Sequence, residues 1–168
     1  MLTIKTVDCE DQLRIIDELA ATILPEVYKE IMPSDDIQFL YQHYHSFEAL
    51  KQNLKEGVNI KLLFEEDEPI GYLTFIISKQ CLQIEKLYFT KNFRNKGYGN
   101  TVFSFIDELM RNAKLNKQRL VVHKANTKAI SFYKKKGFRC IKPLEHFFDN
   151  GHTVHSYVME KDLYKIKI

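Results

Sequence analysis

A short turn that combines glycine with basic side chains gives the strongest chemical signal in the sequence. The run 94–99, RNKGYG, contains Gly97 and Gly99 and stands between an expected strand and an expected long helix. Glycine lets the backbone approach a ligand closely, and the first amide N–H groups of a helix have no intrahelical partner, so several can point at one anion. Lys91 and the basic residues of the run add positive charge there. We therefore expect a pyrophosphate site, although a glycine pair alone fits a purely structural turn equally well.

Two other kinds of phosphate-binding turn do not fit this run. It lacks the G-K-[ST] ending of a P-loop. It also lacks the third glycine and the early position in the chain that are typical of a dinucleotide-binding turn.

A second block has the spacing of a functional helix. Its residues follow the pattern N-x-x-A-x-x-F-Y-x-x-x-G-F and are Asn126, Ala129, Phe132, Tyr133, Gly137 and Phe138. Asn126 and Tyr133 are seven residues apart, which places both on one helix face. The Tyr133 hydroxyl is a candidate proton donor, and the alternative is a half-buried aromatic whose hydroxyl finds a backbone partner. We expect Phe132 in the core.

Together the two blocks resemble two signatures of the GNAT N-acyltransferase superfamily. The first, R/Q-x-x-G-x-G/A, is similar to 94–99 after the strand residues Leu87-Tyr88-Phe89, and the second begins at Asn126. The resemblance covers roughly residues 59–160, and 156–161 is similar to the bacterial spermidine/spermine acetyltransferase group. It implies an α/β (mixed α+β), three-layer α-β-α GNAT-like fold with a mixed, mostly antiparallel central sheet. It also implies a single N-acetyltransferase domain over 1–168.

The resemblance implies an acetyl-CoA-dependent enzyme that moves an acetyl group directly to a primary amine of a small molecule, with polyamines as candidates, or of a peptide. Backbone groups of Leu87 and Phe89 would pair with the pantetheine arm, residues 94–100 would hold the pyrophosphate, and Tyr133 would donate a proton to the leaving thiolate. The cofactor-binding residues implied in this way are Leu87, Tyr88, Phe89, Arg94, Asn95, Lys96, Gly97, Tyr98, Gly99, Asn100, Asn126 and Lys136.

A protonated amine acceptor must lose a proton before it attacks a thioester. Glu85 is our candidate base because side chains alternate along a strand, so it shares a face with Leu87 and Phe89. Some GNAT enzymes use a strand carboxylate slightly farther back, where this chain has Gln83. Glu85 is also compatible with a structural pair to Lys86 or Lys124. The other candidate bases or relays are His123, His152 and His155.

The first helices and the last hairpin are where the resemblance places acceptor specificity. Carboxylates and aromatic rings there would suit a cationic amine, and solvated acids with core tyrosines are the alternative. These residues are Glu26, Tyr28, Glu30, Asp35, Asp36, Tyr41, Tyr44 and His45.

Apolar spacing and turn signals predict the elements that must position these groups, in the order β-α-α-β-β-β-α-β-α-β-β. Asp8 is the expected N-cap of the first helix, which Pro25 should end or bend. A helix start is expected at 34–36, a further helix from Ser46 to Gly57, and a hairpin turn at Asn150-Gly151. The expected strands are 2–7, 60–65, 70–78, 82–89, 119–123, 138–148 and 153–160, with long and short helices from Gly99 and before Gly137.

Composition narrows the class of protein. A chain of 168 residues with 45% hydrophobic and 28% charged residues is long enough for one core and is typical of a folded domain. A net charge of +3 gives no support to nucleic-acid binding, and no apolar run reaches the length of a membrane span. Cys9, Cys81 and Cys140 lack disulfide or zinc spacing, so we expect reduced core thiols and no metal site. We expect a cytoplasmic monomer or homodimer.

Two other functions stay open at this point. One is a non-catalytic acyl-CoA-binding regulatory module that keeps the phosphate site without turnover. The other is a small nucleic-acid binder that uses the basic residues Lys51, Lys55, Arg94, Lys96, Lys134, Lys135 and Lys136.

Overall fold

The strands follow the predicted order, and the helical elements include an addition before the second strand. The computed structural model describes residues 1–164, so the last residues of the predicted domain, 165–168, lie outside the described part. The elements are β1 (Leu2–Thr6), α1 (Glu10–Tyr28), α2 (Ser34–Leu40), η1 (Tyr41–His45), α3 (Phe47–Lys55), β2 (Asn59–Glu65), β3 (Glu68–Ile77), β4 (Cys81–Phe89), η2 (Lys91–Phe93), α4 (Tyr98–Asn112), β5 (Lys117–His123), α5 (Thr127–Lys135), β6 (Arg139–Phe147) and β7 (Thr153–Asp162).

The addition is a π-helical turn, η1, that continues α2 as far as His45. Ser46 then adopts extended backbone, with φ −68° and ψ 161°, and its hydroxyl accepts a hydrogen bond from the Ala49 amide at 3.3 Å. Ser46 is therefore the N-cap of α3, as predicted. Three α-helices and η1 separate β1 from β2. The three expected helical regions are all present, whereas the predicted order, which counted two helices here, was one helix short. A π-helical turn has no characteristic residue pattern from which it could have been predicted.

The two ends of α1 differ from the prediction. Cys9, and not Asp8, is the N-cap, and the Gln12 side chain accepts hydrogen bonds from both amides, at 2.9 Å from Asp8 and 3.3 Å from Cys9. Pro25 does not end the helix, which continues to Tyr28, and the Pro25 carbonyl accepts a hydrogen bond from Lys29 at 3.0 Å. The missing N–H of a proline is tolerated there because the neighbouring turn is anchored by buried Ile23 and Leu24.

The strands form one mixed sheet in the order β1-β2-β3-β4-β5-β7-β6, so the fold is mixed α+β as expected. The chain divides into two compact units, the first made of Met1–Ile76 with Lys86–Ser104, the second of Ile77–Glu85 with the chain from Phe105 onward.

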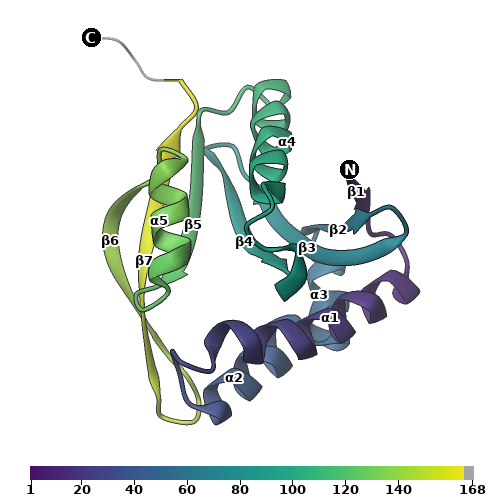
Figure 1. The fold of residues 1–168 in the computed structure, drawn as a ribbon. Helices are drawn as coiled ribbons and strands as arrows, with labels where there is room; N and C mark the ends of the chain where they lie inside the picture. The colour runs from purple at the N-terminus through teal and green to yellow at the C-terminus, as the bar shows by residue number, and fades with distance from the viewer. Residues whose placement is uncertain (165–168) are drawn as a thin grey trace. The chain divides into compact units, whose positions relative to one another are not determined.

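The first unit builds its core between strands and the early helices. β1 pairs antiparallel with β2, and β2 pairs antiparallel with β3 with a bulge at Leu63/Phe64. Figure 1 shows α1, α2 and α3 gathered together, and their inward faces bury one apolar cluster. Leu13, Ile16 and Ala20, predicted from helical spacing, are all within 1% of full burial.

The second unit combines one parallel and two antiparallel pairings. The first half of β4 pairs parallel with β5, and β7 pairs antiparallel with both β5 and β6. The predicted hairpin between the last two strands is confirmed, because Gly151 takes a φ of +83° in the turn that joins them.

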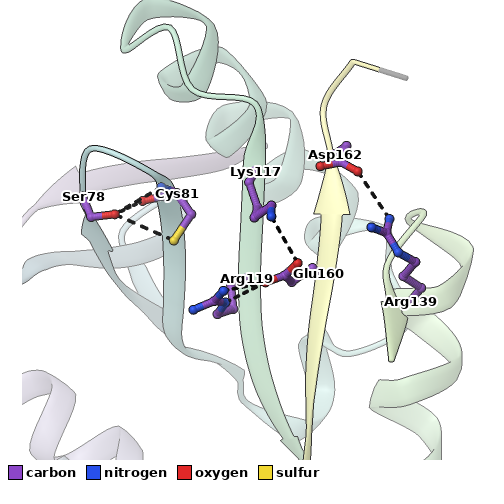
Figure 2. A network of polar contacts seen from close by, with 7 residues as sticks. All are labelled: Ser78, Cys81, Lys117, Arg119, Arg139, Glu160 and Asp162. Carbon is purple, nitrogen blue, oxygen red and sulfur yellow. Dashed lines mark hydrogen bonds and ion pairs between the residues drawn. The ribbon is translucent and has the colours of Figure 1, made fainter. Parts of the chain in front are cut away.

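A buried carboxylate holds β5 and β7 together in the second unit. Glu160 is 6% exposed and accepts hydrogen bonds from the Arg119 guanidinium at 2.6 and 2.9 Å (Figure 2). Lys117 Nζ lies 3.5 Å from its other oxygen. Burial by itself raises the pKa of the Glu160 carboxyl, but the Arg119 hydrogen bonds and the Lys117 charge outweigh it and lower the pKa below its ordinary value.

The cysteines depart from the expectation of core thiols. All three are free, yet only Cys81 is buried, while Cys9 and Cys140 are exposed. Cys9 caps a helix and Cys140 lies on the edge strand β6, and both positions face solvent. No helix within residues 1–164 combines the length and the apolar character that crossing a membrane requires.

We predict that Glu160→Gln lowers the free energy of unfolding at pH 7 by about 1.5 to 3 kcal/mol, the range for hydrogen bonds to a charged group. Urea unfolding monitored by circular dichroism measures it. Because the folded-state pKa lies below the ordinary 4.5, the stabilisation is present above pH 4.5 and is lost as the pH falls below it, so the variant should approach wild type in acid.

Asp162→Asn is the matched control. It removes a more exposed pair with Arg139, whose N–O distance is 3.3 Å, and should change the stability by less than about 1 kcal/mol. Equal losses in both variants would contradict the special role of Glu160.

Candidate active site

The end of β4 is fixed by close contact with a glycine of β3. A Cβ at Gly71 would lie 2.2 Å from the Tyr88 carbonyl oxygen, closer than atoms can approach, and 3.2 Å from Phe89 Cα, a tight contact. Directly after the strand, the Thr90 amide donates to the Ile70 carbonyl at 2.9 Å. Only glycine permits this approach, so Gly71 determines where the predicted pantetheine-pairing backbone lies in the first unit.

The predicted phosphate turn is an open, left-handed bend that leads into α4. Asn95 has a φ of 60° and Gly97 a φ of 82°. A Cβ built on Gly97 meets no atom within 4 Å, so space surrounds this backbone. Asn95, Lys96 and Gly97 are exposed, and α4 begins at Tyr98. The first amides of α4 therefore face an open bend, which suits an anion.

Aromatic rings pack around Tyr98, the first residue of α4 after the turn. The Tyr98 ring lies 6.3 Å from Phe89 and 6.2 Å from Phe93, measured between centroids. The Tyr98 hydroxyl donates a hydrogen bond to the Glu65 carboxylate. Lys96 Nζ lies 5.0 Å from the Phe93 ring centroid. The Tyr98 side chain thus contributes packing, and its backbone amide lies at the bend.

Arg94, a predicted pyrophosphate-binding residue, makes two contacts within the protein. Its Nε donates to the Phe89 carbonyl at 2.9 Å, and its Nη2 lies 3.0 Å from Glu26 Oε2. Both groups are partly exposed, at 30% for Arg94 and 33% for Glu26. The guanidinium predicted to hold pyrophosphate is therefore occupied in part by a carbonyl and a carboxylate of the protein.

The remaining predicted residues, Glu85, Asn126, Tyr133 and Lys136, belong to the second unit. Asn126 precedes α5 as its N-cap, and its side chain accepts a hydrogen bond from the Ala129 amide at 3.3 Å. Tyr133 packs edge-on against Phe132 and Phe138, at centroid distances of 5.7 and 5.9 Å. Lys136 is the C-cap, before Gly137 with its φ of +94°.

The candidate bases differ in their exposure and in their hydrogen-bond partners. Glu85 is exposed, and Gln83 Nε2 donates to its carboxylate at 2.7 Å. His123 accepts a hydrogen bond at Nδ1 from the Ala125 amide at 3.0 Å, and burial, followed by the nearby charge of His155, lowers its pKa. His155 Nδ1 lies 3.4 Å from a Glu145 oxygen. His152 lies in the exposed turn of the last hairpin. Among these groups, Glu85 alone is an exposed strand carboxylate.

Two residues expected to line the acceptor site lie in the core instead. Tyr28 is 8% exposed and its hydroxyl is 2.8 Å from that of Tyr88. His45 is 3% exposed, and its Nδ1 lies 2.9 Å from the Tyr72 hydroxyl. Desolvation by burial lowers the pKa of His45 well below its usual 6.5, and the Lys86 charge adds to this. These side chains form a neutral polar cluster inside the first unit.

The other expected acceptor residues divide between surface and core. Asp36 is buried, and Tyr41 donates to Asp17, a contact that raises the pKa of Tyr41 to about 12. Tyr44 is 37% exposed, and Glu30 and Asp35 are exposed. Glu26 contacts the phosphate turn through Arg94.

Four residues that the sequence prediction missed support the site: Glu65, Gly71, Tyr72 and Phe93. Gly71 carried a detectable signal, because an isolated glycine inside a strand pattern often marks close backbone approach. The others are ordinary strand or loop residues whose role depends on long-range packing.

Comparison with protein families places this fold and turn in a class. Residues 24–138 match the model of the Acetyltransferase (GNAT) family, which is more than half of the chain. The chain therefore belongs to the GNAT acetyltransferase family, and the enzyme class is acyltransferase.

Particular relatives are similar at lower identity. A spermidine N(1)-acetyltransferase from Thermoplasma acidophilum is 24% identical over 143 residues, covering 82% of this chain and 88% of the relative. The crystal structure of PaiA N-acetyltransferase from the same organism, in complex with coenzyme A, has a TM-score of 0.78 at 21% identity and covers 96% of this chain and 99% of that one. A GNAT acetyltransferase from Elizabethkingia anophelis with acetyl-CoA bound has a TM-score of 0.63 at 14% identity, covering 96% and 97%.

The buried histidine gives a testable pH dependence. Its folded-state pKa lies below 6.5, so the unfolded chain binds the extra proton, and the free energy of unfolding should fall as the pH drops below 6.5. His45→Asn removes this titration and should flatten the slope by up to about 1.4 kcal/mol per pH unit. Urea unfolding of both proteins between pH 5 and pH 7 measures it.

His43→Asn on the same π-helical turn is the control, because His43 is exposed and its Nδ1 lies 3.0 Å from the Phe39 carbonyl oxygen. A slope that is unchanged in His45→Asn, or changed equally in the control, would show that His45 is not the titrating group.

Proposed function

We propose that this protein is an acetyl-CoA-dependent N-acetyltransferase that moves an acetyl group directly to a primary amine of a small molecule or peptide. The observation that carries the proposal is the open, left-handed bend at Gly97 before α4, because it exposes backbone amides where a diphosphate can be bound. The bound coenzyme A and acetyl-CoA of the family structures are consistent with acetyl-CoA as co-substrate. We also propose that residues 1–168 act as one domain.

The donor set of the turn suits a diphosphate. Backbone N–H groups and the side chains of Lys91 and Lys96 supply donors and positive charge. Hydrogen bonds to an ionised phosphate are about twice as strong as those between neutral groups. Lys91 and Lys96 are exposed, so both can turn toward an anion, Lys96 by leaving the Phe93 ring.

The chemistry of acyl transfer assigns two further roles. Attack of an amine on a thioester develops negative charge first on the carbonyl oxygen and then on sulfur. A backbone N–H at Leu87 or Phe89, held in place by the Gly71 contact, would stabilise the first charge. We propose that Tyr133 donates a proton to the second, and that Asn126 and Lys136 contribute to binding the co-substrate from the start and end of α5.

We propose Glu85 as the group that removes the proton from the acceptor amine. Its carboxylate is exposed and is held by Gln83 through a neutral amide, so no cation competes in that contact. The position that would carry the alternative strand carboxylate is thereby used to orient Glu85. The two residues are adjacent on one face of β4.

The acceptor class follows from charge and from the relative. Glu30 and Asp35 are exposed carboxylates near the ends of α1 and α2, and carboxylates attract a polycation. The curated relative acts on spermidine according to its name. We therefore propose a polyamine as the first acceptor to test, with a cytoplasmic monomer or homodimer as the working form.

Nucleic-acid binding fits less well. Lys51 Nζ lies 2.8 Å from the Glu10 carboxylate, and Arg94 is paired with Glu26. These pairs neutralise two of the basic residues on which that alternative depends.

The turn can be tested with a single methyl group. Gly97→Ala finds open space but forces a side chain into a φ of +82°, which costs roughly 1 to 2 kcal/mol, so the bend should shift away from its binding geometry. We expect the dissociation constant of coenzyme A, measured by isothermal titration calorimetry, to rise about 5- to 30-fold. Gly151→Ala is the matched control, since it has a φ of +83° and also meets no atom within 4 Å.

Equal effects in the two variants would contradict the phosphate role of the turn. Release of free coenzyme A from acetyl-CoA, measured with polyamines, amino acids, aminoglycosides and peptides, tests catalysis itself. Tight binding without release for any amine would replace the enzyme with the non-catalytic acyl-CoA-binding module.

Tyr133→Phe tests the proposed acid. Removing the hydroxyl should lower kcat about 10²-fold, the lower range for general acid catalysis, and leave the coenzyme A affinity within about twofold. Steady-state kinetics and calorimetry measure the two quantities. Tyr157→Phe, also in the second unit, is the control and should keep wild-type kcat. A loss of affinity with unchanged kcat would assign Tyr133 to binding.

A further inference from the structure

We propose that Glu26 is a positioning residue for the coenzyme-binding turn and acts through Arg94. The inference rests on the proposed function and deepens it, because it separates the part of the turn that contacts the anion from the part that sets its shape. The carboxylate comes from the last turn of α1, and the guanidinium comes from the first residue of the run 94–99.

Arg94 joins three segments of the first unit with two neighbouring N–H donors. The Nε donor binds the Phe89 carbonyl at 2.9 Å, and Nη2 binds Glu26 Oε2 at 3.0 Å. Phe89 is the last residue of β4, and Arg94 directly precedes the left-handed Asn95. The side chain therefore closes the segment 89–94 on itself and fixes the direction from which the chain enters the bend.

Glu26 is itself held by the structure around it. Pro25 precedes it within α1, and the Pro25 carbonyl accepts the Lys29 amide at 3.0 Å, so the last turn is hydrogen-bonded. Two residues further along, the Tyr28 hydroxyl lies 2.8 Å from the Tyr88 hydroxyl. The end of α1 is thus joined to β4 at two neighbouring points, Tyr88 directly and Phe89 through Arg94.

The sign of the charge effect distinguishes positioning from simple electrostatics. A carboxylate near a diphosphate repels it, so a Glu26 that acted only by its charge would weaken binding of the coenzyme, and its removal would strengthen binding. A Glu26 that holds Arg94 in place has the opposite effect. Without it the guanidinium can leave the Phe89 carbonyl, and the bend loses its fixed entry.

The experiment measures coenzyme A affinity by calorimetry in the full chain. Glu26→Gln keeps the shape and removes the charge, and Arg94→Gln keeps an N–H donor for the Phe89 carbonyl and loses the ion pair. We expect Glu26→Gln to raise the dissociation constant about three- to fivefold, and to have no further effect when Arg94→Gln is already present. The KM for acetyl-CoA should rise with kcat unchanged. Glu18→Gln, an exposed carboxylate of the same helix, should match wild type.

Three results would overturn the inference: tighter binding in Glu26→Gln, the same affinity as Glu18→Gln, or an equal loss in the Arg94→Gln background. Thermal unfolding accompanies each titration, and a loss of affinity that follows only a loss of folded protein also counts against positioning. Failure of the proposed function has a separate signature, because wild type itself would then not bind coenzyme A.

Discussion

The approach of the Tyr88 carbonyl to Gly71 is the constraint on which the candidate site depends. A Cβ at Gly71 would lie 2.2 Å from the Tyr88 carbonyl oxygen, so the end of β4 can lie this close to β3 only with glycine at position 71. The Thr90 amide then bonds to Ile70, and the turn follows directly. Under the proposed function this backbone contacts the thioester and supports the phosphate turn, so it must be placed with little freedom, because a misplaced donor stabilises developing charge poorly. Here one missing Cβ supplies that placement.

In the interior of the first unit, tyrosine and histidine side chains that were expected to bind the acceptor instead stabilise the core. Tyr28, His45 and Tyr72 are nearly fully buried, yet each has a polar partner, in the pairs of Tyr28 with Tyr88 and His45 with Tyr72. Buried hydroxyl and imidazole groups are costly unless they are paired and neutral. Burial raises the pKa of Tyr28 and Tyr72 and lowers that of His45, so all three stay uncharged at neutral pH. The cluster supports the strand that carries Tyr88, and it does not present a charge to a substrate.

Local rules explain what could be predicted from the sequence. The Ser46 cap, the left-handed Gly137 and the Asn150-Gly151 turn each depend on a few neighbouring residues, and each is present. The register of the last hairpin follows from its turn. The pairing of Glu26 with Arg94 spans 68 residues of sequence, and no local pattern encodes it. Burial of His45 was missed for a related reason. A histidine beside tyrosines has the same sequence pattern whether these side chains line a site or pack in the core. The spacing of Asn126 and Tyr133 did not show that Asn126 is the N-cap of α5, because caps and first-turn residues share the same spacing.

The position of Arg94 bears on how a basic residue in a phosphate-binding signature should be interpreted. A side-chain cation is mobile and attracts any anion, whereas backbone amides fixed by a left-handed bend present a defined geometry. In this chain the Arg94 guanidinium donates to the Phe89 carbonyl of β4 and to the Glu26 carboxylate of α1. The proposed phosphate contacts in the exposed bend would then come from backbone amides and from Lys96. Under the proposed function the charge of Arg94 would attract the diphosphate at a distance, while its hydrogen bonds to Phe89 and Glu26 keep the turn in shape. Binding by backbone amides, with Arg94 used for shape, suits a co-substrate that must bind and leave in every turnover. A rigid bend gains selectivity, and no strong ion pair has to break on release.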